Sequence, residues 1–403
     1  MKLFTMKILH YQSNYSLLVF VLILFQQGTN QLYSFCPFCA TQGRTLASEV
    51  DQAMMIVYGT LSNPIRDPND FSKGTTELNI KTIIKDHELL KNRKSITLPR
   101  YIPVDEKKGK KKNYYLIFID VYKDTLDPYR GEPVDEGSKI ADYLKGAIQI
   151  RSKSNEEKLK YFFDYLDNKE PMISLDAEME FGNIDYPAFE KIAKTFPKKK
   201  VIDWLTDPNT PARRFGLYGS MLGHCGKKED AGILLKLIDD PSNRYLSGLD
   251  GILAGYVMLE PTKGFDYVIA RIKKPKEEFN ARYAILRMVR FFWEYRHDVV
   301  PQKELLQAMK LFINQSDVSD LAIEDLRKWK QWQFTDDIVA LYDKESHNIP
   351  LIKRAILRFV LSNPKADKSA TEFIQKIKKA DPERVQNIQE LLNLENNQQG
   401  AKK

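Results

Sequence analysis

The chain contains little of the chemistry that most enzymes need. Its 403 residues include only three cysteines and five histidines. The histidines are scattered, and none has a second histidine or a carboxylate at metal-ligand spacing on a recognisable helix. The sequence also lacks a nucleophile elbow, a phosphate-binding glycine loop, a His-Glu-x-x-His zinc motif and dinucleotide-binding glycines. We therefore predict that the protein is not an enzyme and needs no cofactor.

The sequence lacks an apolar run long enough to cross a membrane unaided. The N-terminal run over residues 17–25 has nine apolar residues, whereas a spanning helix needs about 20. This length, preceded by Lys2 and Lys7, is typical of a signal-peptide core. No Ala-x-Ala triplet marks the cleavage site, and the candidates are near Gly28 or Ser34. We predict a signal peptide over residues 1–34 and an extracytoplasmic protein, secreted or periplasmic; the alternative is an uncleaved N-terminal membrane anchor.

The chain also lacks a strong excess of one charge. The net charge is +8, and basic residues are interspersed with acids along the whole chain. We therefore predict no nucleic-acid binding. The densest basic run, residues 107–112, lies between two predicted strands. It is interpreted as a solvated hairpin loop, with attraction to an anionic surface as the alternative.

Two of the cysteines form the motif Cys36-Pro37-Phe38-Cys39, directly after the predicted export signal. A thioredoxin-like site would need a strand before it and a helix after it, and haem attachment would need a histidine at position 40. Neither context is present. A local or intermolecular disulfide through Cys36 and Cys39, or a metal site, remains open. Cys225 is interpreted as a small buried hydrophobic residue.

The region from 35 to 135 has the pattern of a small β module. Apolar and polar residues suggest strands at 54–61, 77–84, 95–98 and 114–121. Proline and glycine predict a bend over residues 127–134, which begin with Asp127-Pro128-Tyr129-Arg130-Gly131. A linker with a short helix is expected over residues 136–155.

The region from 156 to 394 has the pattern of an α-solenoid. Amphipathic segments begin near residues 212, 245, 281, 321 and 351, and two of them end in Ala-Ile-Leu-Arg. Each is followed by a second apolar-periodic segment, which gives a repeat of about 30 to 40 residues, as in stacked helix pairs. Proline marks the turns at Pro208, Pro241, Pro364 and Pro382. The polar residues 395–403 are predicted to be a disordered tail.

Arginines recur in the first helices of these pairs. Their structural interpretation is inter-repeat salt bridges; the alternative is a basic stripe that binds an acidic partner. An acidic cluster (Asp164, Asp167, Asp176, Glu178 and Glu180) is interpreted as a solvated helix face. The candidate partner-binding residues are Arg213, Arg214, Arg282, Arg287, Arg354 and Arg358.

These patterns carry three resemblances. The helical region resembles HEAT repeats, and the cysteine-containing β module resembles the OB-like barrels of the netrin and tissue-inhibitor-of-metalloproteinase class. The whole chain is similar to exported bacterial proteins with an N-terminal Cys-Pro-Phe-Cys segment, a small β module, an Asp-Pro-Tyr-Arg-Gly segment and HEAT-like helices. This likeness implies an envelope protein.

The sequence therefore predicts a multidomain α+β protein, with an OB-like antiparallel β module followed by an α-solenoid. We expect an exported scaffold that binds one or more protein partners in the envelope or outside, with peripheral membrane association as an option. The alternative is a thiol-redox or metal-binding protein that acts through Cys36 and Cys39.

Overall fold

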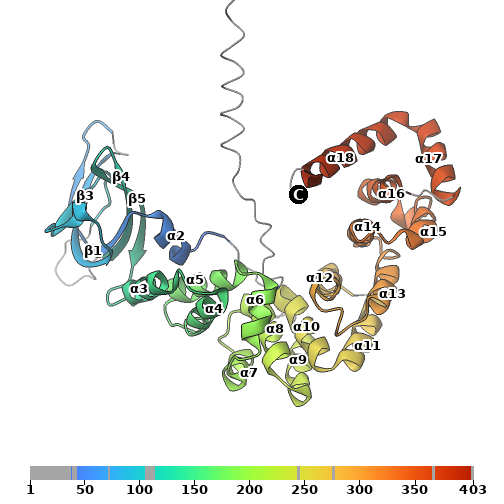
Figure 1. Cartoon of the computed structure of the whole chain (residues 1–403), viewed down its shortest axis with the longest axis horizontal. Helices are drawn as coiled ribbons and strands as arrows, with labels where there is room; N and C mark the ends of the chain where they lie inside the picture. The colour runs from blue at the N-terminus through green and yellow to red at the C-terminus, as the bar shows by residue number, and fades with distance from the viewer. Residues whose placement is uncertain are drawn as a thin grey trace, which may run out of the picture.

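The computed structural model describes residues 38, 43–70, 73–104, 114–242, 246–274, 277–364 and 368–400. The chain is α+β, with a five-stranded antiparallel sheet near the N-terminus followed by a long series of helices (Figure 1). The predicted order of a β module before a helical region is confirmed.

The sheet has the strand order β3-β2-β1-β4-β5. Its four predicted strands are present, although β1 continues to Arg66, beyond the predicted end at residue 61. The predicted bend at 127–134 is wrong, because this segment pairs with β4 along its length. The bounds are β1 Met55–Arg66, β2 Gly74–Lys85, β3 Ser95–Leu98, β4 Tyr114–Tyr122 and β5 Thr125–Val134.

Gly59 lets β1 continue through a close approach to its neighbour. A Cβ at this position would lie 2.1 Å from the backbone oxygen of Asn79 on β2. The register between β1 and β2 shifts at the same place, between Tyr58 and Gly59. A glycine inside a strand often marks such a bulge, so here it bends the strand and does not end it.

The two faces of the sheet belong to different hydrophobic clusters. Ile56 and Phe118 point into the cluster that also contains the core of the helical region. Val57 and Ile117, the adjacent residues on the same strands, point into a separate cluster within the β module. This alternation follows the two-residue period of a strand. It makes one face of the sheet continuous with the helical core.

Helices occupy the positions that the repeat pattern predicts. The first helices of successive pairs begin at 215, 249, 279, 319 and 350, within a few residues of the expected starts. Helices end just before the four proline-marked turns. The bounds are α2 Leu46–Gln52, α3 Ile140–Ile150, α4 Asn155–Phe163, α5 Pro171–Gly182, α6 Tyr186–Ala193, α7 Lys198–Thr206, α8 Phe215–Cys225, α9 Ala231–Ile238, α10 Leu249–Leu259, α11 Pro261–Ile272, α12 Phe279–Tyr295, α13 Gln302–Phe312, α14 Ser319–Lys328, α15 Thr335–Val339, α16 Pro350–Ser362, α17 Lys368–Ala380 and α18 Pro382–Gly400.

The helices form an open arc, with the sheet at one end and α17 and α18 at the other (Figure 1). Helices α12, α14 and α16 lie on the inner side, and α11, α13, α15 and α17 lie on the outer side. The arginine-bearing first helices of these pairs therefore face the inside of the arc.

Glycines allow α8 and α10 to pack unusually closely. A Cβ at Gly251 would lie 2.1 Å from the backbone oxygen of Gly216, and a Cβ at Gly255 would lie 2.1 Å from that of Gly219. Side chains at these positions would force the two backbones apart. The glycines therefore set the spacing of this helix pair at the middle of the arc.

The C-terminal end differs from the prediction. The sequence indicates a disordered tail from residue 395, whereas α18 continues to Gly400. Glu395 forms ion pairs with Arg327 and Arg358, which attach this turn of α18 to α14 and α16. Within the part of the chain that the structure describes, no helix is both long and apolar enough to cross a membrane.

Candidate functional site

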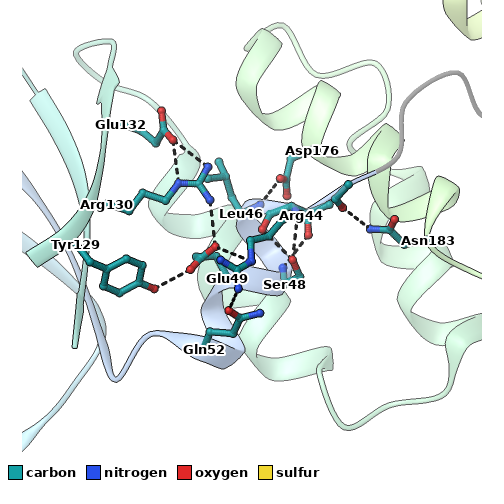
Figure 2. Close-up of polar contacts among 12 residues, drawn as sticks. Arg44, Leu46, Ser48, Glu49, Gln52, Tyr129, Arg130, Glu132, Asp176 and Asn183 are labelled. Carbon is teal, nitrogen blue, oxygen red and sulfur yellow. Dashed lines mark hydrogen bonds and ion pairs between the residues drawn. The ribbon is translucent and has the colours of Figure 1, made fainter. Parts of the chain in front are cut away.

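The junction between the β module and the helices is built on buried carboxylates. Asp176 of α5 is almost fully buried and accepts hydrogen bonds from the backbone N–H groups of Leu46 and Ala47, at the start of α2 (Figure 2). It also accepts one from the hydroxyl of Tyr143 on α3, at 2.8 Å. A carboxylate here satisfies helix N-terminal donors that have no partner within the helix. Asp176 thus joins α2, α3 and α5.

Glu49 of α2 is the second buried carboxylate at this junction, with 1% of its side chain exposed. It accepts a 2.7 Å hydrogen bond from the Tyr129 hydroxyl and lies 3.1 Å from Nη1 of Arg130. Arg44 contacts it from the other side at 3.4 Å (Figure 2). Tyr129 and Arg130 belong to the Asp-Pro-Tyr-Arg-Gly segment, so this segment connects the edge of the sheet to α2.

A third carboxylate has a pKa in the neutral range. Burial raises the pKa of Glu180 to about 7, against a hydrogen bond from the Thr45 hydroxyl that lowers it. Burial likewise raises the pKa of Asp176, while its hydrogen bonds with Leu46 and Tyr143 lower it. The two acids lie one helical turn apart on α5. Both acids contact the start of α2, Glu180 through the Thr45 hydroxyl and Asp176 through the backbone N–H groups of Leu46 and Ala47.

The interpretation of the acidic cluster as a solvated helix face is wrong for Asp176 and Glu178. Asp164 and Asp167 are exposed, as expected, but Asp176 and Glu178 are buried. Glu178 lies 2.7 Å from Nε of Arg214 and 3.2 Å from Nε of Arg213. No local pattern indicates this burial, because Glu178 and the two arginines that pair with it are about one repeat apart along the chain.

Most of the candidate arginines bridge neighbouring repeats. Arg287 of α12 lies 2.9 Å from Asp250 of α10, and Arg282 lies 3.2 Å from Asp317. Arg214 pairs with an acid 36 residues earlier, and Arg358 with one 34 residues earlier. These separations match the repeat length, so the pairs connect equivalent places in successive repeats.

Arg354 differs from the other five candidates. It is exposed on α16, and in the described ranges no acidic group pairs with it. Arg213 and Arg287 are partly exposed, with 40% and 37% of their side chains accessible. The partner-binding prediction therefore rests on these three arginines, since Arg214 is buried and Arg282 and Arg358 are largely covered by their own ion pairs.

Two further arginines, which the sequence patterns did not single out, form the same kind of ion pair between repeats. Arg290 of α12 lies 2.6 Å from Asp325 of α14, and Arg327 of α14 lies 2.8 Å from Glu395 of α18. The available signal was an acid at a distance of one repeat, as for Arg290 and Asp325, which are 35 residues apart. Pairing basic and acidic residues at the repeat spacing would have found this contact.

Phe38, inside the Cys-Pro-Phe-Cys motif, is buried against the helical region. Its ring meets that of Phe291 on α12 edge to face, with centroids 4.6 Å apart. Helix α8 also packs closely against Phe38, because a Cβ at Gly216 would lie 3.1 Å from the backbone oxygen of Phe38. Cys36 and Cys39 themselves lie outside the described residues, so the disulfide or metal prediction stays a prediction.

Cys225 and the neighbouring His224 lie in the last turn of α8. Burial raises the pKa of Cys225 to about 11 and lowers that of His224 to about 4. His224 Nε2 lies 3.1 Å from the Tyr186 hydroxyl. Cys225 is half-buried and packs against the core, as its interpretation as a small hydrophobic residue predicts. Among the residues that the structure describes, no cluster of three histidine, cysteine or acidic side chains has a metal-binding arrangement.

Comparison of the chain with protein-family models, with curated proteins and with solved structures gave no match.

Proposed function

We propose that this protein is an exported, protein-binding scaffold of the cell envelope, in which the inner side of the helical arc receives an acidic partner. The observation that carries the proposal is the exposure of basic side chains among the candidate arginines, of which Arg354 belongs to α16 and Arg287 to α12, two helices on the inner side of the arc. Arg354 is exposed on α16, and Arg213 and Arg287 remain more than one third exposed in spite of their ion pairs. An arc of stacked helices presents an extended surface of the kind that repeat proteins use for binding.

Apolar side chains beside Arg354 add to this surface. Leu351, on the same helix, is 63% exposed, and Ile349, just before the helix, is 40% exposed. Binding surfaces commonly combine exposed apolar residues with arginine, which forms two-pronged hydrogen bonds with carboxylates. The start of α16 is therefore the best-defined part of the proposed contact surface.

The finer fold assignments belong to the same proposal. The HEAT-like character is supported by the helix starts, which recur at the repeat spacing, and by the ion pairs between successive repeats. An OB-fold is a partly open barrel of five strands. The β module likewise has five strands, in the order β3-β2-β1-β4-β5, and the sheet is open between its outer strands β3 and β5. Within the described part of the module, no ladder joins β3 to β5 to close a barrel.

Charge reversal at Arg354 tests the binding proposal. This residue is a better choice than Arg282, whose side chain is 14% exposed and paired with Asp317. The full-length mature protein, wild type or Arg354→Glu, is immobilised and exposed to an extract of its own envelope fraction, and retained proteins are quantified by mass spectrometry. We expect at least one acidic protein to be retained severalfold less by the variant.

The matched control is Lys303→Glu, at an exposed cation of α13, which is a helix on the outer side of the arc. It produces the same change in net charge at a place where no contact is proposed. Equal retention of every protein by the wild type and Arg354→Glu would refute the proposal. A matching loss with Lys303→Glu would show nonspecific attraction of acids to a basic protein.

A second candidate is a thiol-redox or metal function of Cys36 and Cys39. It is favoured by the burial of Phe38, one of the two residues between the cysteines, against Phe291. Intact mass of the natively isolated protein, with and without reduction and alkylation, measures thiol state and bound metal. A reversible two-electron thiol couple or stoichiometric metal would support this function, whereas full activity of a Cys36→Ser, Cys39→Ser variant in the native host would exclude it.

A further inference from the structure

The β module contains a pocket between the two outer strands of its sheet, β3 and β5. Its volume is about 290 Å³, and it lies between the chain that follows β3 and the edge strand β5. Tyr115 and Ile117 of β4 form part of the lining, together with Ile102 after β3. Gly131 of β5 helps to keep the pocket open, because a Cβ there would lie 2.9 Å from the Cδ1 of Ile117. The pocket is therefore bounded by mainly apolar surface.

Two arginines line this pocket, Arg100 and Arg130, and they differ in whether a carboxylate compensates their charge. Arg130 lies 3.1 Å from Glu49 and 2.8 Å from Glu132, so two carboxylates compensate its charge. Arg100 is exposed, and nowhere in the described chain does a carboxylate or hydrogen-bond acceptor pair with its guanidinium. The pocket thus combines an apolar lining with one uncompensated cation at its edge.

The edges of the sheet argue against an added β-strand as the occupant. β5 carries Pro128 and Pro133, which have no N–H to donate to a neighbouring strand. β3, on the other side of the opening, is only four residues long. Prolines and short strands are devices by which edge strands avoid further pairing. A compact ligand fits this opening better than an extended peptide strand.

The chemistry of the pocket selects the ligand class. A volume near 290 Å³ is at the lower end for small-molecule sites, and it suits one apolar side chain or short alkyl chain. A guanidinium forms two parallel hydrogen bonds with a carboxylate. We propose that this pocket binds a small apolar carboxylate, with Arg100 pairing with the carboxylate group and Ile117 contacting the apolar group.

This proposal does not depend on the contact surface of the helical arc. The ligand has two chemically equivalent sources, a free carboxylic acid or the C-terminal residue of a peptide. Octanoate represents the first, and the tripeptide Ala-Ala-Leu represents the second. The C-terminal amide of the same tripeptide keeps the apolar group and removes the negative charge.

Methyl NMR of the full-length mature protein tests the site directly. With isoleucine δ1-methyl labelling, Ile117 and Ile102 report on the pocket, and Ile356, buried in α16, serves as the distant reference. We expect saturable shifts of the Ile117 and Ile102 methyl signals with octanoate, Ala-Ala-Leu or both, and none at Ile356. The tripeptide amide should bind at least about tenfold more weakly, because it loses a charge-assisted hydrogen bond.

Arg100→Gln should weaken the binding of the carboxylate by about tenfold or more and leave the amide unaffected. Lys94→Gln is the matched control, because it removes an exposed cation that does not line the pocket. Both positions are exposed, and unchanged methyl spectra without ligand would verify folding. No pocket shifts at millimolar ligand, equal affinity for acid and amide, or full affinity in Arg100→Gln would each overturn the proposal. A preference for octanoate over Ala-Ala-Leu would identify the free acid as the ligand, and the reverse would identify a peptide C-terminus.

Discussion

Nε of Arg358 lies 2.6 Å from Oε1 of Glu324, a residue 34 positions earlier on the neighbouring inner helix. Nη2 of the same guanidinium lies 2.7 Å from Oε2 of Glu395 on α18. Arg327 contacts the same two acids. These four side chains therefore bind the last inner helices to the C-terminal helix through charge-assisted hydrogen bonds.

Arg358→Leu should destabilise the C-terminal end of the arc. The substitution leaves Glu324 and Glu395 with one cation between them, and these groups are largely covered by neighbouring side chains. We expect a loss of about 1 to 3 kcal/mol in the free energy of unfolding. Urea denaturation measures the change. Arg354→Leu, on the exposed face of the same helix, should change stability by less than about 0.5 kcal/mol, and equal effects of the two variants would contradict the assigned role.

Asp176→Ala should release α2 from the helical region. It removes the acceptor of the Leu46 and Ala47 N–H groups and of the Tyr143 hydroxyl, so two buried donors and one half-buried donor lose their partner. A cost of about 2 to 4 kcal/mol is expected, and hydrogen exchange should accelerate at Leu46 and Ala47. Asp164→Ala removes an exposed carboxylate from the same region and should leave exchange unchanged. Protection of both amides in Asp176→Ala would show that other contacts hold α2.

Glu180 should make stability decrease as the pH rises through the weakly acidic range. Its pKa is about 7 in the folded protein and near 4.5 when unperturbed, so the folded state binds more protons between these values. The stabilisation is complete below the unperturbed pKa and is lost as the pH approaches about 7, by roughly 3 kcal/mol. Asp176, Asp51 and Lys158 modulate this titration through their charges.

Glu180→Gln tests that linkage, because glutamine keeps the size and the carbonyl acceptor but does not titrate. Urea unfolding at a series of pH values should give a flatter stability profile for this variant than for the wild type between about pH 5 and pH 7. Glu88→Gln, at an exposed position, should retain the wild-type slope. Identical profiles for Glu180→Gln and the wild type would exclude Glu180 as the titrating group.

Gly251→Ala and Gly232→Ala should have opposite effects, although both replace a helical glycine. A Cβ at Gly251 would lie 2.1 Å from the oxygen of Gly216, so α8 and α10 must separate. A Cβ at Gly232 would meet no atom within 4 Å. We expect Gly251→Ala to cost about 1 to 3 kcal/mol and Gly232→Ala to stabilise by about 0.5 to 1 kcal/mol. Thermal unfolding of both variants measures the difference, and tolerance of alanine at 251 would show that the pair is not closely packed.

Local sequence patterns determined the elements of this protein. The alternation at residues 77–84 and the apolar periodicity of the helix pairs depend on which face of one strand or helix is buried, so each pattern reports its own element. Proline likewise marks helix ends through its missing N–H. The predicted strands and the starts of the first helices were found in this way. The bend predicted at 127–134 was wrong because pairing with β4 extends a segment whose prolines are tolerated at a sheet edge.

Only the tertiary structure decided which charges are buried and which are free. Asp176 and Glu178 have the local surroundings of solvated acids, yet their partners at Leu46 and Arg214 are 130 and 36 residues away. A single sequence has no local signal for such contacts, because burial of a charge depends on what the other elements place around it. The same reason separates Arg100 and Arg354 from the paired arginines: each arginine is equally basic in the sequence, and packing determines which of them keep charge available for a ligand or partner.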